Sequence, residues 1–160
     1  MTVNVDPYAA AQDTGAALLA RFDIPRIDVG LVLGSGWSSA IEGVATTIAE
    51  APLEELPGFS KPVVAGHGGV ARVLKTTSGR LALVLTGRTH FYEGRGVAPV
   101  AHGVRVIAAA GASRVVLTNG CGGLRTEWAP GTPVLISDHI NLTASSPIEG
   151  ARFVDLTDAY

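Results

Sequence analysis

The chain has 160 residues, a length that suits one domain with a real hydrophobic core. Apolar residues make up 47% of it and charged residues only 16%, which excludes a disordered chain and favours a well-buried α/β domain. The net charge is −2 and the sequence has no basic run, so a nucleic-acid partner is not expected. The low charge leaves apolar surface to be covered, as in an oligomer.

The sequence also bears on the compartment. Cys121 is the only cysteine, so an intramolecular disulfide is impossible and a reducing compartment fits. The first residues lack the basic region and apolar core of a signal peptide. No apolar stretch approaches the roughly 20 residues that are needed to span a bilayer. We therefore expect a cytoplasmic protein with no membrane partner.

The N-terminal part of the chain alternates between helix and strand signals. An Ala-rich segment from Pro7 to Arg21 predicts a helix with Asp6 as its N-cap. The apolar, β-branched run 27–33 predicts a strand that ends in the tight turn 34–36. A short helix is expected over residues 37–43.

The middle of the chain predicts a hairpin and then a second long helix. The segment 70–75 and the apolar run 81–85 flank the turn signal of residues 77–80. Pro99 opens a helix that Gly111 closes, and His102 is expected on its exposed side. The predicted apolar face of this helix consists of Val100, Val104, Ile107 and Ala108.

Two further strands are predicted, a buried one at 115–117 and another at 133–136. The resulting order is β-α-β-β-α-β-β. It predicts an α/β fold in which a mixed central sheet is flanked by helices. With no repeat or linker, residues 1–160 are expected to form a single domain.

The strongest functional signal follows the strand 81–85. Arg88, His90, Tyr92 and Glu93 stand together in the loop that this apolar strand enters, where an α/β protein places its chemistry. Arg88 offers bidentate anion recognition, and His90 offers a donor that can be charged near neutral pH. A solvated loop whose charges pair with one another is the less favoured alternative. A metal site is not expected, because His90 and Glu93 have no evident further ligands.

Two glycine-rich turns point to a phosphate. Gly34-Ser35-Gly36 follows a strand and precedes a helix, but Ser39 stands where a dinucleotide fingerprint needs glycine, and no P-loop lysine follows. What remains is either an anion nest that includes the Ser35 hydroxyl or an ordinary tight turn, about equally. Residues 119–123 form the second turn, another place where an anion could meet backbone N–H groups.

Other polar residues give weaker signals. His67 is flanked by glycines, which let a ligand approach it. Cys121 could act as a nucleophile with His67 or His90 as its base, but a filler role is favoured because its neighbours in the sequence are apolar and glycine-rich. Asp138-His139 could be an acid–base pair, although a structural hydrogen bond is favoured.

Taken in order, these motifs resemble those of the trimeric, low-molecular-mass purine nucleoside phosphorylases, from about Val29 to Tyr160. The motifs are Gly34-Ser35-Gly36, Leu56-Pro57-Gly58-Phe59, Gly66-His67-Gly68-Gly69, Gly87-Arg88-x-His90-x-Tyr92-Glu93-Gly94, Thr118-Asn119-x-x-Gly122-Gly123-Leu124, Asp138-His139-Ile140-Asn141-Leu142 and Asp158-Ala159-Tyr160.

The resemblance implies reversible phosphorolysis in purine salvage: a purine (deoxy)ribonucleoside and orthophosphate give the free base and (deoxy)ribose 1-phosphate. It implies a homotrimer with no cofactor, in which orthophosphate is a co-substrate. The phosphate-binding residues that it implies are Ser35, His67, Arg88, His90 and the backbone N–H of Gly120. Tyr92 would bind the ribose, and Phe153 would cover the sugar of a neighbouring subunit. His90, Arg88 and Glu93 would be catalytic, with Glu93 orienting His90 or a water.

One departure from the family stands out. The family's base-binding residues lie downstream of Asp158-Ala159-Tyr160, where this chain stops, so the chain itself holds no base-binding residue. We therefore expect a domain truncated after Tyr160, with its sheet incomplete at the C-terminus, that corresponds to roughly the N-terminal three-fifths of such an enzyme. A methylthioadenosine phosphorylase and an inactive phosphate-binding fragment stay open as alternatives. The base preference stays open too.

Overall fold

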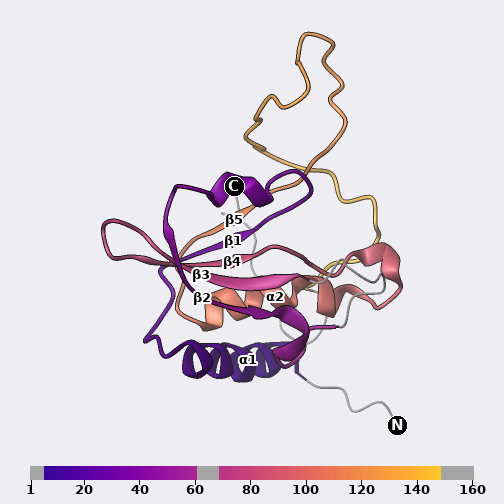
Figure 1. The fold of residues 1–160 in the computed structure, drawn as a ribbon. Helices are drawn as coiled ribbons and strands as arrows, with labels where there is room; N and C mark the ends of the chain where they lie inside the picture. Colours follow the sequence, from indigo (N-terminus) through magenta and orange to yellow (C-terminus); the bar gives the residue numbers. More distant parts are fainter. Residues whose placement is uncertain (1–5, 61–68, 149–160) are drawn as a thin grey trace. The chain divides into compact units, whose positions relative to one another are not determined.

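The computed structural model describes residues 6–60 and 69–148, which Figure 1 draws in colour. The chain divides into two compact units, residues 1–120 and 121–160. All helices and strands found in the described residues belong to the first unit. The candidate site is therefore built on that unit.

The first unit is organised around a mixed sheet of five strands in the order β2-β3-β4-β1-β5 (Figure 1). β1 runs parallel to both β4 and β5, whereas β3 is antiparallel to its two neighbours, β2 and β4. The strands are β1 Val29–Val32, β2 Thr46–Pro52, β3 Val70–Lys75, β4 Leu81–Leu85 and β5 Val115–Leu117. The predicted mixed sheet is confirmed, and β3 and β4 have the predicted bounds.

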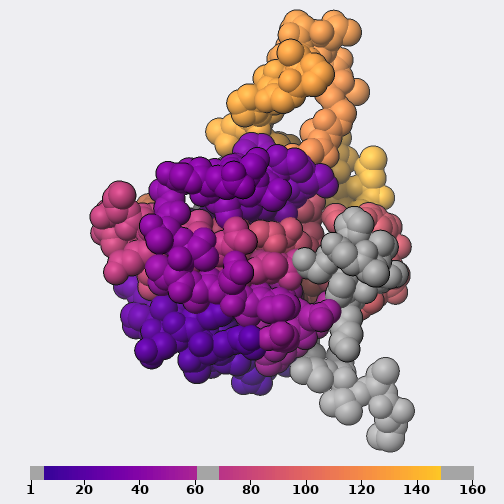
Figure 2. Space-filling model, in the orientation of Figure 1, coloured from indigo at the N-terminus to yellow at the C-terminus, as the bar shows by residue number. Residues whose placement is uncertain are grey.

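Two helices, α1 (Pro7–Phe22) and α2 (Val97–Ala109), lie together on one side of the sheet (Figure 1). α1 begins as predicted, since the Asp6 carboxylate accepts a hydrogen bond of 3.0 Å from the N–H of Tyr8. The other face of the sheet is covered by the connection 33–45 instead of a long helix. Figure 2 shows this connection, in purple, across the upper part of the first unit. The helices thus cover one face only.

The alternation of side chains along β4 divides the core in two. Leu83 and Leu85 join the buried cluster beneath the helices, whereas Ala82 and Val84 join a second cluster on the opposite face. Successive residues of a strand point to opposite faces, so a strand that is apolar throughout is buried on both sides. This explains why the sequence run 81–85 contains no polar position.

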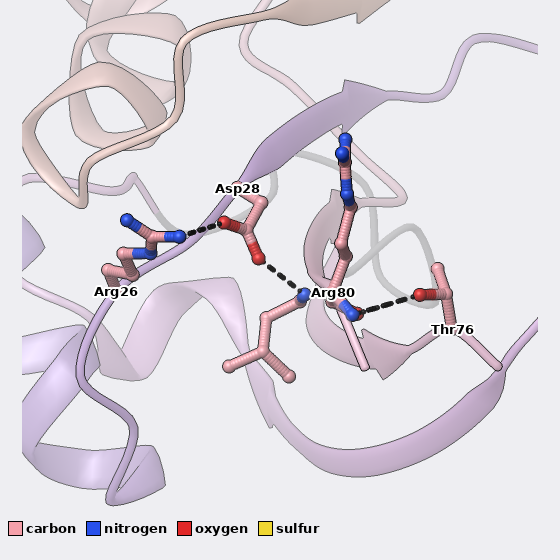
Figure 3. Close-up of polar contacts among 5 residues, drawn as sticks. Arg26, Asp28, Thr76 and Arg80 are labelled. Atoms are coloured by element: carbon pink, nitrogen blue, oxygen red, sulfur yellow. Dashed lines mark hydrogen bonds and ion pairs between the residues drawn. The ribbon is translucent and has the colours of Figure 1, made fainter. Parts of the chain in front are cut away.

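The amino end of β1 is held in register by Asp28 (Figure 3). Its carboxylate accepts a hydrogen bond of 2.9 Å from the N–H of Leu81 and pairs at 2.9 Å with Arg26. The Leu81 hydrogen bond lowers the pKa of Asp28 below the usual carboxyl value, and the Arg26 and Arg80 charges act in the same direction against partial burial. In the adjoining hairpin turn, Thr76 Oγ1 accepts a hydrogen bond of 3.0 Å from the N–H of Arg80.

Three predictions of secondary structure were incomplete or wrong. β2 was not predicted, because it is an edge strand with mostly exposed residues and therefore lacks a clear apolar alternation. The helix expected at 37–43 is only a short 3₁₀ turn, Ser38–Ile41. Residues 133–136 form no strand, and Leu135 is 96% exposed there. A strand needs a hydrogen-bonded neighbour, which sequence alone cannot supply.

Two predictions of burial were also wrong. β5 is a strand as predicted, but Leu117 is 59% exposed because β5 lies at the edge of the sheet. His102 was expected to be exposed and is instead buried, together with Val106 and Ile107, whereas Ala108 is exposed. The buried face of α2 therefore includes His102, which the prediction placed on the exposed side. His102 can be buried because Pro57 and Thr14 are polar partners for its ring in the interior.

Candidate active site

The candidate site lies where the three parallel strands end. Ser35 follows β1, Arg88 follows β4 and Gly120 follows β5, each within a few residues. The carboxyl ends of parallel strands meet at one edge of a sheet, which is where α/β folds bind ligands. The topology thus assembles side chains and backbone groups that are far apart in the sequence.

The two glycine-rich turns lie against one another at this edge. The N–H of Gly34 donates to Thr118 Oγ1 at 2.9 Å, and the indole N–H of Trp37 donates to the carbonyl oxygen of Asn119 at 3.1 Å. A Cβ on Gly34 would lie 2.5 Å from the carbonyl oxygen of Thr118, so only glycine fits there. The first turn therefore packs against the end of β5, and its role as an anion nest stays a prediction.

Arg88 lies beside the first of these turns. Its Nη1 donates a hydrogen bond of 3.2 Å to the carbonyl oxygen of Leu33, at the end of β1. The same Nη1 atom is 3.1 Å from the position that a Cβ on Gly34 would take. The half-buried guanidinium is thus fixed next to the turn that carries Ser35, where it adds a positive charge.

His90 and Glu93 bind each other reciprocally across the short 3₁₀ turn Phe91–Glu93. Glu93 Oε1 accepts a hydrogen bond of 2.7 Å from the N–H of His90, and the His90 ring accepts one from the N–H of Glu93. Glu93 also pairs at 3.6 Å with Arg95. Because one ring nitrogen accepts, a neutral His90 carries its proton on the other nitrogen, which can donate to a ligand.

The ring of Tyr92 stacks on that of His90, with centroids 4.9 Å apart and planes 11° from parallel. Tyr92 is otherwise 83% exposed. This stacking limits how the His90 ring can turn. The expected contact of Tyr92 with ribose stays a prediction.

A pair of glycines brings the hairpin strands close together at the same edge. A Cβ on Gly87 would lie 2.8 Å from the Cα of Gly69, so neither position has room for a side chain. Gly69 ends the predicted motif around His67, and Gly87 precedes Arg88. His67 and Phe153 themselves lie outside the described residues, so their roles stay predictions.

The remaining candidate residues from the sequence are Asp138, His139 and Cys121. The backbone N–H of His139 donates to the Asp138 carboxylate at 2.7 Å. The role of the His139 ring stays a prediction. Cys121 is exposed. Over residues 6–60 and 69–148, no group of three or more His, Cys, Asp or Glu side chains could hold a metal ion. In the same ranges no helix is long and apolar enough to cross a membrane.

Sequence reasoning assigned no role at the site to Trp37 or Thr118. Both tie the first glycine turn to the second. A usable signal was present, because a tryptophan directly after a turn carries one N–H donor that tends to find a partner when the ring is partly buried. Which partner it finds depends on the sheet order, which the sequence does not reveal.

Comparison with known proteins gives a consistent result. Residues 28–160 match the family model described as the phosphorylase superfamily. A purine nucleoside phosphorylase from a Cellulomonas species is 54% identical in an alignment of 159 positions, which covers 97% of this chain and 56% of that protein. One from Mycobacterium tuberculosis is 48% identical over 155 residues, or 97% of this chain and 58% of that protein. The chain thus spans a little over half the length of these curated relatives.

Solved structures agree. Isoform 2 of purine nucleoside phosphorylase from Schistosoma mansoni, in complex with cytosine and ribose-1-phosphate, matches with a TM-score of 0.73. The identity is 30%, and the match covers 96% of this chain and 56% of that one. The similarity therefore extends over nearly all of the sequence.

Proposed function

Since the chain belongs to the phosphorylase superfamily, we propose that it is the N-terminal part of a purine nucleoside phosphorylase. Such an enzyme is a pentosyltransferase, which moves the (deoxy)ribosyl group of a purine nucleoside from the base to orthophosphate. The relatives reported above carry this enzyme's name, which favours it over a methylthioadenosine phosphorylase.

The observation that carries the proposal is the meeting of Ser35, Arg88 and Gly120 at one edge of the sheet. Arg88 is fixed by Leu33, next to the turn of Ser35. A Cβ on Gly120 would lie 3.3 Å from the carbonyl oxygen of Ser35, so the second turn approaches the first closely. A guanidinium, a hydroxyl and a backbone N–H together suit a phosphate ion.

Phosphorolysis needs a site that holds orthophosphate beside the sugar. Orthophosphate is a weak nucleophile, so Arg88 and the N–H donors would hold it against C1′ of the sugar and turn a bimolecular step into a positioned one. The glycosidic bond would break with oxocarbenium character, and the adjacent phosphate anion would stabilise the cationic sugar. His90, oriented through Glu93, would donate to the phosphate from its free ring nitrogen.

The rest of the proposed active site completes this arrangement. His67 would lie beside the phosphate and Tyr92 against the ribose, while Phe153 would cover the sugar of a neighbouring subunit. Base recognition would come from residues outside this chain. We further propose a cytoplasmic homotrimer that acts in purine salvage and uses no cofactor, with orthophosphate as co-substrate.

The test is the turnover of inosine with and without inorganic phosphate, followed as release of hypoxanthine, both by this chain and by the longer natural product. We expect phosphate-dependent release by the longer protein. Stabilisation of the 160-residue chain by phosphate without turnover would identify it as the phosphate-binding part. Preference for methylthioadenosine over inosine would favour the alternative enzyme, and release that ignores phosphate would contradict both.

A further inference from the structure

Trp37 occupies a position between the two glycine turns that the proposed phosphate site does not explain. Its indole ring packs against the second apolar cluster, which includes Leu33 and Ile41. Its backbone N–H donates to the carbonyl oxygen of Gly34 at 3.1 Å, which closes the first turn. The ring is therefore held both by packing and by the turn from which it emerges.

From this anchored ring, Nε1 donates a hydrogen bond of 3.1 Å to the carbonyl oxygen of Asn119. That oxygen belongs to the peptide unit whose N–H is that of Gly120. A peptide bond is planar and trans, so its C=O and N–H point in opposite directions. Holding the oxygen of Asn119 therefore fixes the direction in which the Gly120 N–H points.

This constraint matters because glycine leaves the backbone free elsewhere in the second turn. Residues 120, 122 and 123 are all glycine, and a Cβ on Gly122 or Gly123 would meet nothing within 4 Å. Gly120 has no side chain to restrict the dihedral angle beside this peptide, so the bond to Asn119 supplies that restraint. A hydrogen bond to the carbonyl also polarises the same peptide and strengthens its N–H as a donor.

We propose that Trp37 is a positioning residue: its indole N–H holds the Asn119–Gly120 peptide so that the Gly120 N–H faces the phosphate. The inference rests on the proposed function, because it names a further residue that acts at the phosphate site. Trp37 does not itself touch the phosphate. It acts through the backbone of the neighbouring strand end.

The test compares Trp37→Phe with wild type. Phenylalanine keeps an aromatic ring against the apolar cluster but removes the N–H. We expect the dissociation constant for inorganic phosphate, measured by calorimetry, to rise about three- to tenfold, the range for loss of one neutral hydrogen bond. In the longer natural enzyme, KM for phosphate should rise while KM for inosine stays unchanged. The amide resonance of Gly120 should shift in the NMR spectrum.

Ile41→Val is the matched control. It trims the same apolar cluster without touching the hydrogen bond, so it should lower stability yet leave the phosphate affinity and the Gly120 resonance at their wild-type values. Equal phosphate binding by Trp37→Phe and wild type, with an unshifted Gly120 resonance, would overturn the inference. If wild type binds no phosphate, the proposed function fails, and the Gly120 resonance alone decides whether Trp37 orients the peptide.

Discussion

Arg88 has two partners of different kinds, the end of β1 and the proposed anion. One guanidinium N–H is used on the carbonyl oxygen of Leu33, which fixes the group in place before any ligand binds. A guanidinium held in this way loses little side-chain freedom when phosphate arrives. Its contribution to binding should accordingly be large.

We expect Arg88→Ala to weaken the binding of inorganic phosphate by about 100-fold, the scale on which a charged partner is lost from a partly buried site. Calorimetric titration of both proteins would measure it. Arg80→Ala is the control, since Arg80 lies in the hairpin turn at the other end of β4 and should leave the affinity unchanged. Equal affinity of Arg88→Ala and wild type would refute the assignment of Arg88.

His102 is buried where three segments of the first unit meet. Its Nε2 lies 3.2 Å from the carbonyl oxygen of Pro57 and 3.4 Å from Thr14 Oγ1, and Phe59 meets its ring edge-on at 4.9 Å. Because Pro57 offers only an acceptor, the neutral ring carries its proton on Nε2. Burial lowers the pKa of His102, outweighing the Pro57 bond, and the nearby Arg105 charge lowers it further.

This histidine gives stability a defined pH dependence. Below about pH 6.5, His102 is protonated in the unfolded chain but stays largely neutral in the folded chain, where its pKa is lower. The unfolded state then binds more protons than the folded state, so the free energy of unfolding falls as the pH falls. We expect wild type to lose more free energy of unfolding between pH 7 and pH 5 than His102→Gln, which keeps an N–H donor but does not titrate. Denaturant unfolding at both values would show it. Asp28, whose lowered pKa affects stability only at lower pH, does not contribute in this window.

At the scale of elements, α2 approaches β1 of the sheet very closely. A Cβ on Gly30 of β1 would lie 2.1 Å from Cγ2 of Ile107, which is buried on α2. The absence of a side chain at Gly30 thus sets how closely helix and strand pack. That spacing in turn positions the end of β1, where the first glycine turn begins.

We expect Gly30→Ala to lower the free energy of unfolding by about 2 kcal/mol through overpacking. The double variant Gly30→Ala with Ile107→Ala should lose less than the sum of the two single variants, because the second change removes the clashing atoms. Gly122→Ala is the control, since its Cβ would meet nothing within 4 Å. Additive losses, measured by denaturant unfolding, would contradict the close contact.

Some strands could be predicted from the sequence and others could not, depending on whether the signal for the strand is local. The hairpin of β3 and β4 was predicted with correct bounds, because the two strand segments and the turn between them are local features of the sequence. β2 was missed, because an exposed edge strand is defined mainly by its hydrogen bonds to β3. Residues 133–136 were wrongly predicted as a strand, because their apolar pattern has no neighbouring strand with which to pair.

At the scale of the whole molecule, one edge of the sheet exposes apolar side chains. β5 forms one edge, and its residues Val115, Val116 and Leu117 are 40%, 49% and 59% exposed. An edge strand with apolar side chains is a template for pairing with another chain. The isolated 160-residue chain should therefore associate as its concentration rises.

We expect Val116→Lys to reduce this association, because a charge on an edge strand opposes pairing. Light scattering over a concentration series would measure the effect. Thr47→Lys, on the opposite edge strand β2, is the control and should change little, since Thr47 is already polar and exposed. Equal association of Val116→Lys and wild type would show that β5 is not the contact.

The sequence by itself determined the hairpin, the N-terminal helix with its Asp6 cap and the motifs of a phosphorylase, because these depend on neighbouring residues and on short spacings. The resemblance already implied that Ser35, Arg88 and Gly120 act on one phosphate. Only the tertiary structure decided that the strands before them are parallel neighbours, that His102 is buried and that Trp37 bonds to Asn119. Each of these depends on which strands are neighbours and which are parallel. Strand pairing is a long-range property, set by packing and hydrogen bonds between distant segments.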